Sequence, residues 1–174
     1  MKETATDNTS MTHAIGEETP GNEKRRLFMM RAGAHLFAVY VDEVEATSEN
    51  LTPTPLPFAP PPVRGVVSQR GRILTVIDPL LLFPDSPPAT PVSPLTGSSA
   101  PLVVALKGDE QLALSIERLE PALDLLAAEA DVADDVSSLL RRTIRHQSME
   151  IALLNPARLF DAAMRGVDRR RRRT

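Results

Sequence analysis

The chain repeats part of its own sequence, and this repeat limits what it can fold into. Residues 33–45 (GAHLFAVYVDEVE) return at 108–120 (GDEQLALSIERLE), 75 positions further on. Residues 74–83 (LTVIDPLLLF) return at 151–160 (IALLNPARLF), 77 positions further on. Two matches in the same order and at nearly one spacing indicate two structural units of one design. In a chain of 174 residues they leave room for one small scaffold and little else.

The composition predicts an aliphatic core in a reducing compartment. Hydrophobic residues make up 42% of the chain but aromatic residues only 3%, so the core must consist of Val, Leu, Ile and Ala. The chain has no cysteine, which excludes disulfides, thiolate metal sites and cysteine nucleophiles. The first 23 residues lack an apolar run of signal-peptide length, and no segment reaches the roughly 20 apolar residues of a membrane span. We therefore expect a soluble, cytoplasmic protein.

The charged residues argue against nucleic-acid binding. Residues 165–174 contain six arginines and one aspartate, a net charge of +5, so the remaining residues carry −8 of the total of −3. A nucleic-acid-binding domain would instead carry its basic residues along a folded face. Arg169–Arg173 could be a solvated tail or could contact an anionic membrane or an acidic partner.

No catalytic constellation emerges from the sequence. The histidines at positions 13, 35 and 146 have no metal-site spacing, and the chain has no Gly-rich phosphate loop with a lysine. Acidic residues are scattered over tails and turns, where a solvated surface explains them. We expect no enzymatic activity, no cofactor and no metal, and a small β scaffold without such a site is typical of a binding module.

The first repeat predicts short strands. Residues 1–24 are polar and lack periodicity, so we expect a disordered tail. Residues 52–62 contain too many prolines for a helix or a central strand and should cross the surface in an extended conformation. Arg70 and Gly71 form the tight turn of a predicted hairpin. The expected strands are 27–31, 36–46, 63–69 and 72–77.

The second repeat predicts a similar unit after a connector. Residues 84–101 are rich in Pro, Ser and Thr and should form a flexible link. Residues 102–106 and 111–119 repeat the first two strands. Residues 131–146 carry a helical stripe, yet the repeat places a strand at 143–147, so we expect a helical turn or two followed by that strand. A last helix should begin at Pro156, after Asn155 as its cap, and end near Met164, leaving 166–174 as an Arg-rich tail.

Six residues on these strands are expected in the core because they are apolar and alternate along predicted strands. They are Val39, Val41 and Ile77 and their repeats Leu114, Ile116 and Leu154.

Residues 56–78 (LPFAPPPVRGVVSQRGRILTVID) resemble the signature of the CheW-like domain family, which has an Ala-Pro-Pro turn, a Gly-Val strand, an Asn-Leu-Arg-Gly turn and a Pro-Val-Ile-Asp strand. The resemblance extends over about residues 25–165. It implies a mainly β fold of two small five-stranded SH3-like β-barrels packed together, with a C-terminal helix. The expected subunits are 27–83 and 102–160. Ser68-Gln69, Thr75 and Pro79 depart from the family pattern.

The resemblance also implies a function. Members of this family are adaptors without catalytic activity or cofactor. They couple the cytoplasmic tip of methyl-accepting chemoreceptors to a CheA-type histidine kinase in chemotaxis or twitching motility, at membrane-associated receptor arrays. Two alternatives remain open: a specialised member that binds only one of these partners, and a membrane-surface localisation factor that uses the arginine tail.

The expected partner surface centres on the predicted hairpin. The resemblance makes Arg70 the family's turn arginine, which lies close to a glutamate of the second strand, here Glu45. An Arg70–Glu45 ion pair could order the hairpin, or Arg70 could be a solvated turn residue. Val63, Val66 and Val67 could face the core or an exposed apolar groove. The predicted partner-binding residues are Glu45, Val63, Arg64, Val66, Val67, Arg70 and Gly71.

Overall fold

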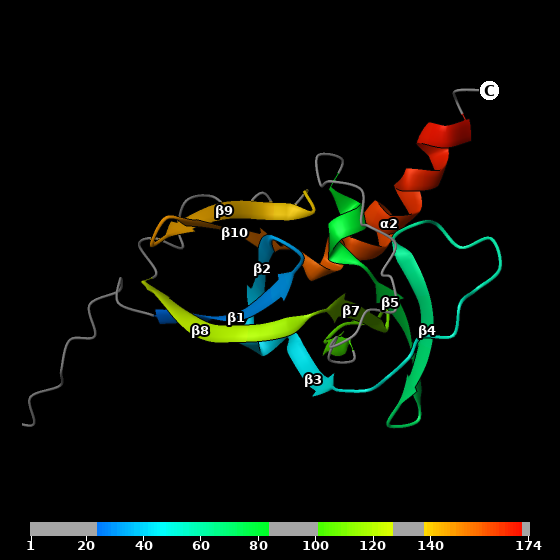
Figure 1. Ribbon diagram of the computed structural model, residues 1–174, viewed down its shortest axis with the longest axis horizontal. Coiled ribbons are helices and arrows are strands. Elements are labelled where there is room, and N and C mark those ends of the chain that lie inside the picture. The colour runs from blue at the N-terminus through cyan, green and yellow to red at the C-terminus, as the bar shows by residue number, and fades with distance from the viewer. Residues whose placement is uncertain (1–23, 84–100, 127–137, 172–174) are drawn as a thin grey trace, which may run out of the picture.

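Two five-stranded β-sheets form the body of the molecule, and a C-terminal helix packs beside them (Figure 1). The computed structural model describes residues 24–83, 101–126 and 138–171. The fold is mainly β, as the sequence predicts, and the two packed sheets fit the SH3-like description. The strands are β1 Lys24–Ala32, β2 His35–Tyr40, β3 Val44–Ser48, β4 Val63–Gln69, β5 Arg72–Ile77, β6 Leu102–Leu106, β7 Leu112–Ile116, β8 Arg118–Leu126, β9 Leu140–His146 and β10 Met149–Leu154. The helical elements are the 3₁₀ turns η1 Val41–Glu43 and η2 Pro79–Leu82 and the α-helix α2 Pro156–Arg171.

Each sheet takes strands from both repeats. The first sheet has the order β8-β1-β2-β10-β9 and the second has the order β3-β6-β7-β5-β4. Strands β1–β5 belong to the first repeat and correspond in order to β6–β10 of the second. Replacing every strand of the first sheet by its counterpart gives the order of the second sheet. The predicted subunits 27–83 and 102–160 are therefore repeats of sequence, and the sheets do not follow their boundaries. Parallel pairing of β2 with β10, and of β7 with β5, joins the two halves of the chain.

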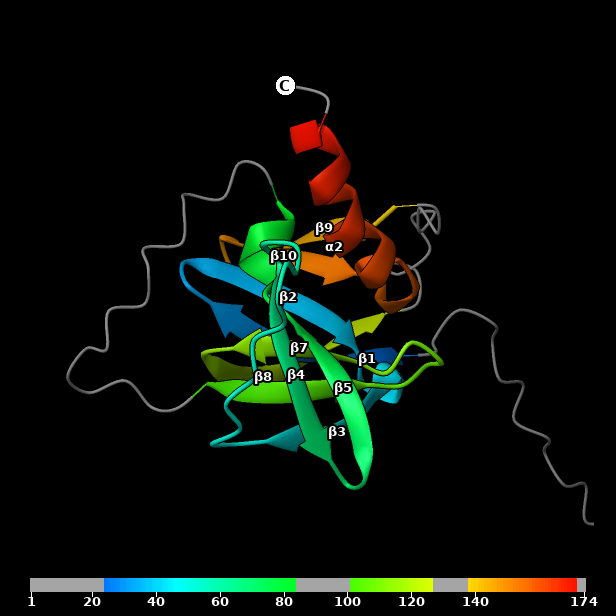
Figure 2. The same ribbon diagram turned by 90° about the vertical axis from the view of Figure 1, so that its right-hand side faces the viewer.

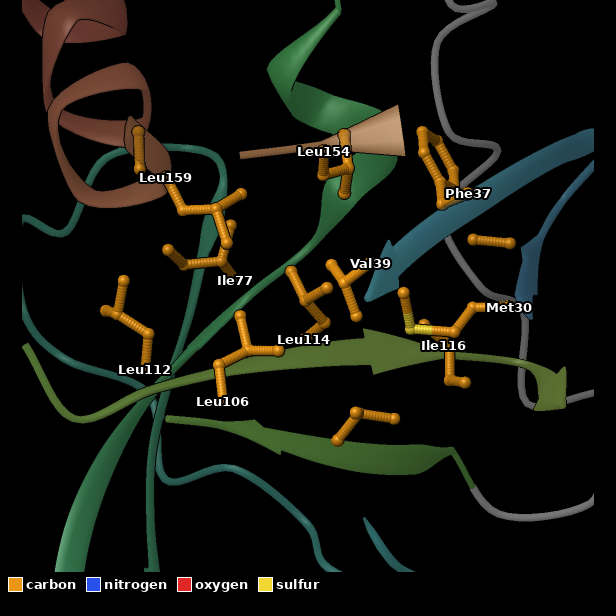
Figure 3. Packing of buried hydrophobic residues seen from close by; sticks show 13 residues of the cluster. Met30, Phe37, Val39, Ile77, Leu106, Leu112, Leu114, Ile116, Leu154 and Leu159 are labelled. Carbon is orange, nitrogen blue, oxygen red and sulfur yellow. The ribbon is translucent and has the colours of Figure 1, made fainter. Parts of the chain in front are cut away.

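Alternation of side chains along these strands builds three apolar clusters. In β6, Val103 and Ala105 belong to a cluster enclosed by strands of the second sheet alone. Val104 and Leu106 point the other way, into the cluster between the two sheets. A matching cluster around Leu27 and Tyr40 fills the first sheet. Because both faces of the central strands are buried, those strands are apolar at nearly every position. The cluster between the sheets, named here the inter-sheet core, includes Met30, Phe37, Val39, Ile77, Leu106, Leu112, Leu114, Ile116, Leu154 and Leu159 (Figure 3).

One predicted strand is wrong in its extent. The run 36–46 is not a single strand, because the 3₁₀ turn Val41–Glu43 interrupts it and carries the chain from the first sheet to the second. The Glu43 carboxylate accepts a hydrogen bond from the Tyr40 backbone N–H at 3.0 Å, which fixes this turn. Val41 is consequently 40% exposed and does not belong to the core. The other five predicted core residues are at most 2% exposed.

The C-terminal helix is longer than predicted. It begins at Pro156, as expected, and continues to Arg171 instead of ending near Met164. The strand expected at 143–147 is present as β9 and begins earlier, at Leu140. The predicted helical turn at 131–137, and nearly all of the predicted N-terminal tail and connector, lie outside the described residues. Within the described ranges, no helix is both long and apolar enough to cross a membrane.

Candidate partner-binding surface

The β4–β5 hairpin projects from the body of the molecule. Both views show its tip beyond the remaining strands of the second sheet (Figures 1 and 2). The strands pair up to Gln69 and Arg72, so the loop consists of only Arg70 and Gly71. Both loop residues have positive φ, 50° and 77°, which matches the right-handed twist of a two-residue hairpin. The predicted turn is confirmed, and both residues are exposed at its tip.

The outward side of this hairpin is partly apolar. It consists of Val66, Ser68, Ile73 and Thr75, which we call the hairpin face. Ser68 lies opposite Ile73, and Val66 opposite Thr75. The Ile73 side chain is 65% exposed, Thr75 is half-buried, and Ile77 on the same side of β5 is 0% exposed within the inter-sheet core. The hairpin face therefore continues the inter-sheet core past the point where the first sheet stops covering it.

Side chains from β3 hold the hairpin next to its loop, at the last strand pair, Gln69 and Arg72. Arg72 Nη1 donates to both carboxylate oxygens of Glu45, at 2.9 and 2.7 Å. The Gln69 side-chain amide also donates to the Ser48 hydroxyl. Because β3 and β4 are opposite edges of the second sheet, these contacts close the curled sheet on itself.

Arg72 thus takes the place predicted for Arg70. Among the residues that the structure describes, the carboxylate of Glu45 pairs with Arg72. The prediction of an Arg70–Glu45 pair is wrong. Arg70 occupies the loop with φ of 50°, whereas Arg72 is the first residue of β5 and its guanidinium reaches the Glu45 carboxylate. The Arg70 guanidinium is left exposed at the tip, where it can meet a partner.

A second ion pair anchors the other end of β4. The Arg64 guanidinium donates to the Asp78 carboxylate, from Nε at 2.9 Å and also from Nη2. The Asp78 side chain is 6% exposed, and its other oxygen accepts from the Leu80 backbone N–H at 2.9 Å, which caps η2. The predicted partner residue Arg64 therefore already has a structural partner.

The predicted valines do not share one environment. Val67 is 5% exposed and belongs to the interior cluster of the second sheet, so it cannot contact a partner directly. Val63 is partly buried against the inter-sheet core. Val66 is half-buried on the hairpin face, and its backbone exchanges hydrogen bonds of 2.8 and 2.9 Å with Thr54. Of the three valines, only Val66 belongs to the hairpin face.

The equivalent hairpin in the other repeat, β9–β10, has a different surface. Arg145 and Glu150 are opposite one another, as Ser68 and Ile73 are in β4–β5. The Arg145 guanidinium donates to the Glu150 carboxylate at 3.1 and 3.0 Å. Where the β4–β5 hairpin exposes an isoleucine, the β9–β10 hairpin carries a solvated ion pair. This difference makes β4–β5 the better candidate for a docking site.

Sequence reasoning did not identify Ile73 as a surface residue. In the run Ile73-Leu74-Thr75-Val76-Ile77 both sides of the strand are apolar, so alternation alone cannot tell which side is exposed. Its register with Ser68 carries the signal, because the same side of β4 is polar there. Phe58 was also missed: it is fully exposed, with φ of 59°. In the part of the chain that the structure describes, no three His, Cys, Asp or Glu side chains gather into a metal site.

Comparison with known proteins agrees with the fold. The family model described as the CheW-like domain matches residues 26–164. Among solved structures, the scaffolding protein TtCheW from Thermoanaerobacter tengcongensis superimposes with a TM-score of 0.62 at 13% sequence identity. The match covers 80% of this chain and 94% of that one. No curated protein matches the sequence.

Proposed function

The chain belongs to the CheW-like domain family, and on this premise we propose that it is a non-enzymatic adaptor that couples chemoreceptors to a CheA-type histidine kinase. The match over residues 26–164 carries the proposal, since it includes nearly all of the described fold. The similar fold of TtCheW, a scaffolding protein by its description, supports it. We place the adaptor in the cytoplasm, at receptor arrays, in chemotaxis or twitching motility.

The hairpin face and the turn are the surface that we assign to partner binding. Ile73 supplies an exposed apolar side chain at the centre, and Arg70 supplies a charge without an intramolecular partner among the described residues. Glu45, Arg72, Arg64 and Asp78 hold the hairpin in place and contribute indirectly. An apolar anchor with a neighbouring arginine is the composition usual at the energetic centre of an interface.

Binding to the purified kinase of the host, and separately to the cytoplasmic fragment of a host chemoreceptor, tests this proposal. We expect Ile73→Glu to weaken binding to at least one partner by roughly 30-fold, which corresponds to a loss of about 2 kcal/mol. Arg70→Ala should weaken it less, by about fivefold, with an unchanged midpoint of thermal unfolding. Calorimetry or biolayer interferometry would measure both effects.

Met149→Glu is the matched control, since Met149 is 40% exposed on the equivalent hairpin. Equal losses for Ile73→Glu and Met149→Glu would contradict the assignment to β4–β5. Wild-type binding to the kinase alone, or to the receptor alone, would identify a specialised member of the family. If wild type bound neither, the adaptor function itself would be refuted.

A further inference from the structure

Helix α2 carries one more apolar stripe than its packing needs. Leu159 and Ala163, each 0% exposed, face the inter-sheet core and attach the helix to the body. Phe160 and Met164, one position after each of these, are 39% and 42% exposed. A helix that covers a core needs one apolar stripe, with polar residues elsewhere. Phe160 and Met164 lie at i and i+4, on the same side of the helix, so they form a second, outward stripe.

The outward stripe leads directly into the most basic part of the chain. Residues 165–174 contain six arginines and one aspartate. The acid nearest to the stripe, Asp161, is paired with Arg158 at 3.9 Å. In both views the last turns of α2 stand clear of the two sheets and point away from the tip of the β4–β5 hairpin (Figures 1 and 2). The end of the helix backbone therefore projects beyond the two sheets.

We propose that the outward stripe of α2 and the arginines that follow it bind the surface of an anionic membrane. Phe160 and Met164 would enter the boundary between headgroups and acyl chains, and the arginines would pair with lipid phosphates. Charge complementarity selects this occupant. A segment with a net charge of +5 next to exposed apolar side chains matches an anionic membrane, which offers both phosphates and acyl chains, better than it matches a polar partner. Two weak signals, apolar insertion and electrostatic attraction, together give reversible membrane binding.

Sedimentation of the full chain with lipid vesicles tests the proposal. We expect binding to phosphatidylcholine vesicles that contain phosphatidylglycerol and none to phosphatidylcholine alone. Replacing Arg169–Arg173 by glutamine, which keeps the length and the helix propensity, should reduce binding at least tenfold. Phe160→Gln with Met164→Gln should reduce it by a smaller but measurable factor. Raising the salt from about 0.1 to about 0.5 M should weaken wild-type binding, because screening shortens the reach of the arginines.

Two controls distinguish insertion of the outward stripe from nonspecific hydrophobic binding to vesicles. Leu119→Gln removes an equally exposed apolar side chain, 41%, from β8 and not from α2, so it should leave vesicle binding unchanged. Phe160→Trp introduces the only tryptophan of the chain, and its fluorescence should shift to the blue on binding and be quenched by brominated lipids.

Three results would overturn the proposal: equal binding to neutral vesicles, no loss on replacing the arginines, or tryptophan fluorescence of the Phe160→Trp variant that does not change on binding. The last result, together with equally tight binding to an oligonucleotide, would show a segment that binds any polyanion. Because vesicles contain neither receptor nor kinase, each outcome is independent of the adaptor function proposed above.

Discussion

Gly65 lies where β4 passes closest to another part of the backbone. A Cβ atom at this position would stand 2.1 Å from the Thr54 carbonyl oxygen, and φ is 140°. Thr54 exchanges two hydrogen bonds with the neighbouring Val66, so the Thr54 backbone cannot withdraw without losing them. The proline-rich crossing segment and the hairpin are thus joined at a point that only glycine can occupy.

We expect Gly65→Ala to lower the free energy of unfolding by at least about 2–3 kcal/mol, combining backbone strain with the clash. Gly108→Ala is the matched control, since Gly108 has a nearly identical φ of 142° with nothing within 4 Å of its added Cβ. Urea unfolding of both variants measures the difference. Equal destabilisation would mean that the backbone conformation, and not the approach of Thr54, makes the glycine necessary.

Glu120 links stability to pH at a single residue. Its carboxylate accepts hydrogen bonds from Arg31 and then from Arg118, and these lower the pKa of Glu120 from its usual value of 4.5. A group with a lowered pKa in the folded state stabilises the fold above its unfolded pKa and loses that contribution as the pH falls through the folded pKa.

The stability difference between wild type and Glu120→Gln should therefore be largest near neutral pH and shrink below about pH 4. Denaturant unfolding at a series of pH values measures it, and Arg31→Gln, which removes the main cause of the shift, should flatten the profile similarly. A difference that stays constant with pH would show that Glu120 acts by packing alone.

At the scale of elements, the two equivalent hairpins form the same two-residue turn with different residues. The β4–β5 loop has Gly71 at its second position, whereas the β9–β10 loop has Gln147 and Ser148, with φ of 47° and 65°. A non-glycine residue in this left-handed region costs about 1–2 kcal/mol. Arg70 and Gln147 have similar φ at the first loop position, so the difference lies at the second, where Ser148 stores strain that Gly71 does not.

Ser148→Gly should raise the stability by about 0.5–1 kcal/mol, since relief of the strain exceeds the added entropy of the unfolded chain. In a chain of this size that raises the unfolding midpoint by roughly 1–4 °C, measurable by scanning calorimetry. Ser68→Gly, a change of the same kind within the extended strand β4, should instead lower it. A loss of stability for both would mean that Ser148 makes contacts worth more than the strain.

The sequence predicts elements better than it predicts the surface. The repeat, the prolines and the Arg-Gly turn determine most strands and the hairpin, because these signals are local. The break at Val41 depends on a carboxylate that returns to the Tyr40 backbone, which strand alternation does not reveal. The exposure of Ile73 depends on how far the first sheet reaches over the hairpin, whereas Val67 is buried by strands of the second sheet itself. The choice of Arg72 over Arg70 for Glu45 likewise depends on how the second sheet curls.

At the scale of the whole molecule, the two halves of the chain depend on each other, because each sheet takes strands from both repeats. Inserting a protease site within residues 84–100 and cutting there should leave both fragments associated, since four strand pairs join the halves. Size-exclusion chromatography of the cut protein should show a single species, and neither fragment alone should unfold cooperatively. Separation of the fragments under native conditions would contradict this reading of the sheets.

The two repeats are arranged like the two subunits of a strand-swapped twofold dimer, joined in a single chain. A single repeat offers two strands to one sheet and three to the other, so it completes neither by itself. Two identical copies, related by a twofold axis, would complete both. Covalent fusion of such a pair removes the need for the copies to remain identical. The two equivalent hairpins can then differ, so that β4–β5 exposes Ile73 whereas β9–β10 carries the pair of Arg145 and Glu150, and one scaffold has two ends of unlike chemistry.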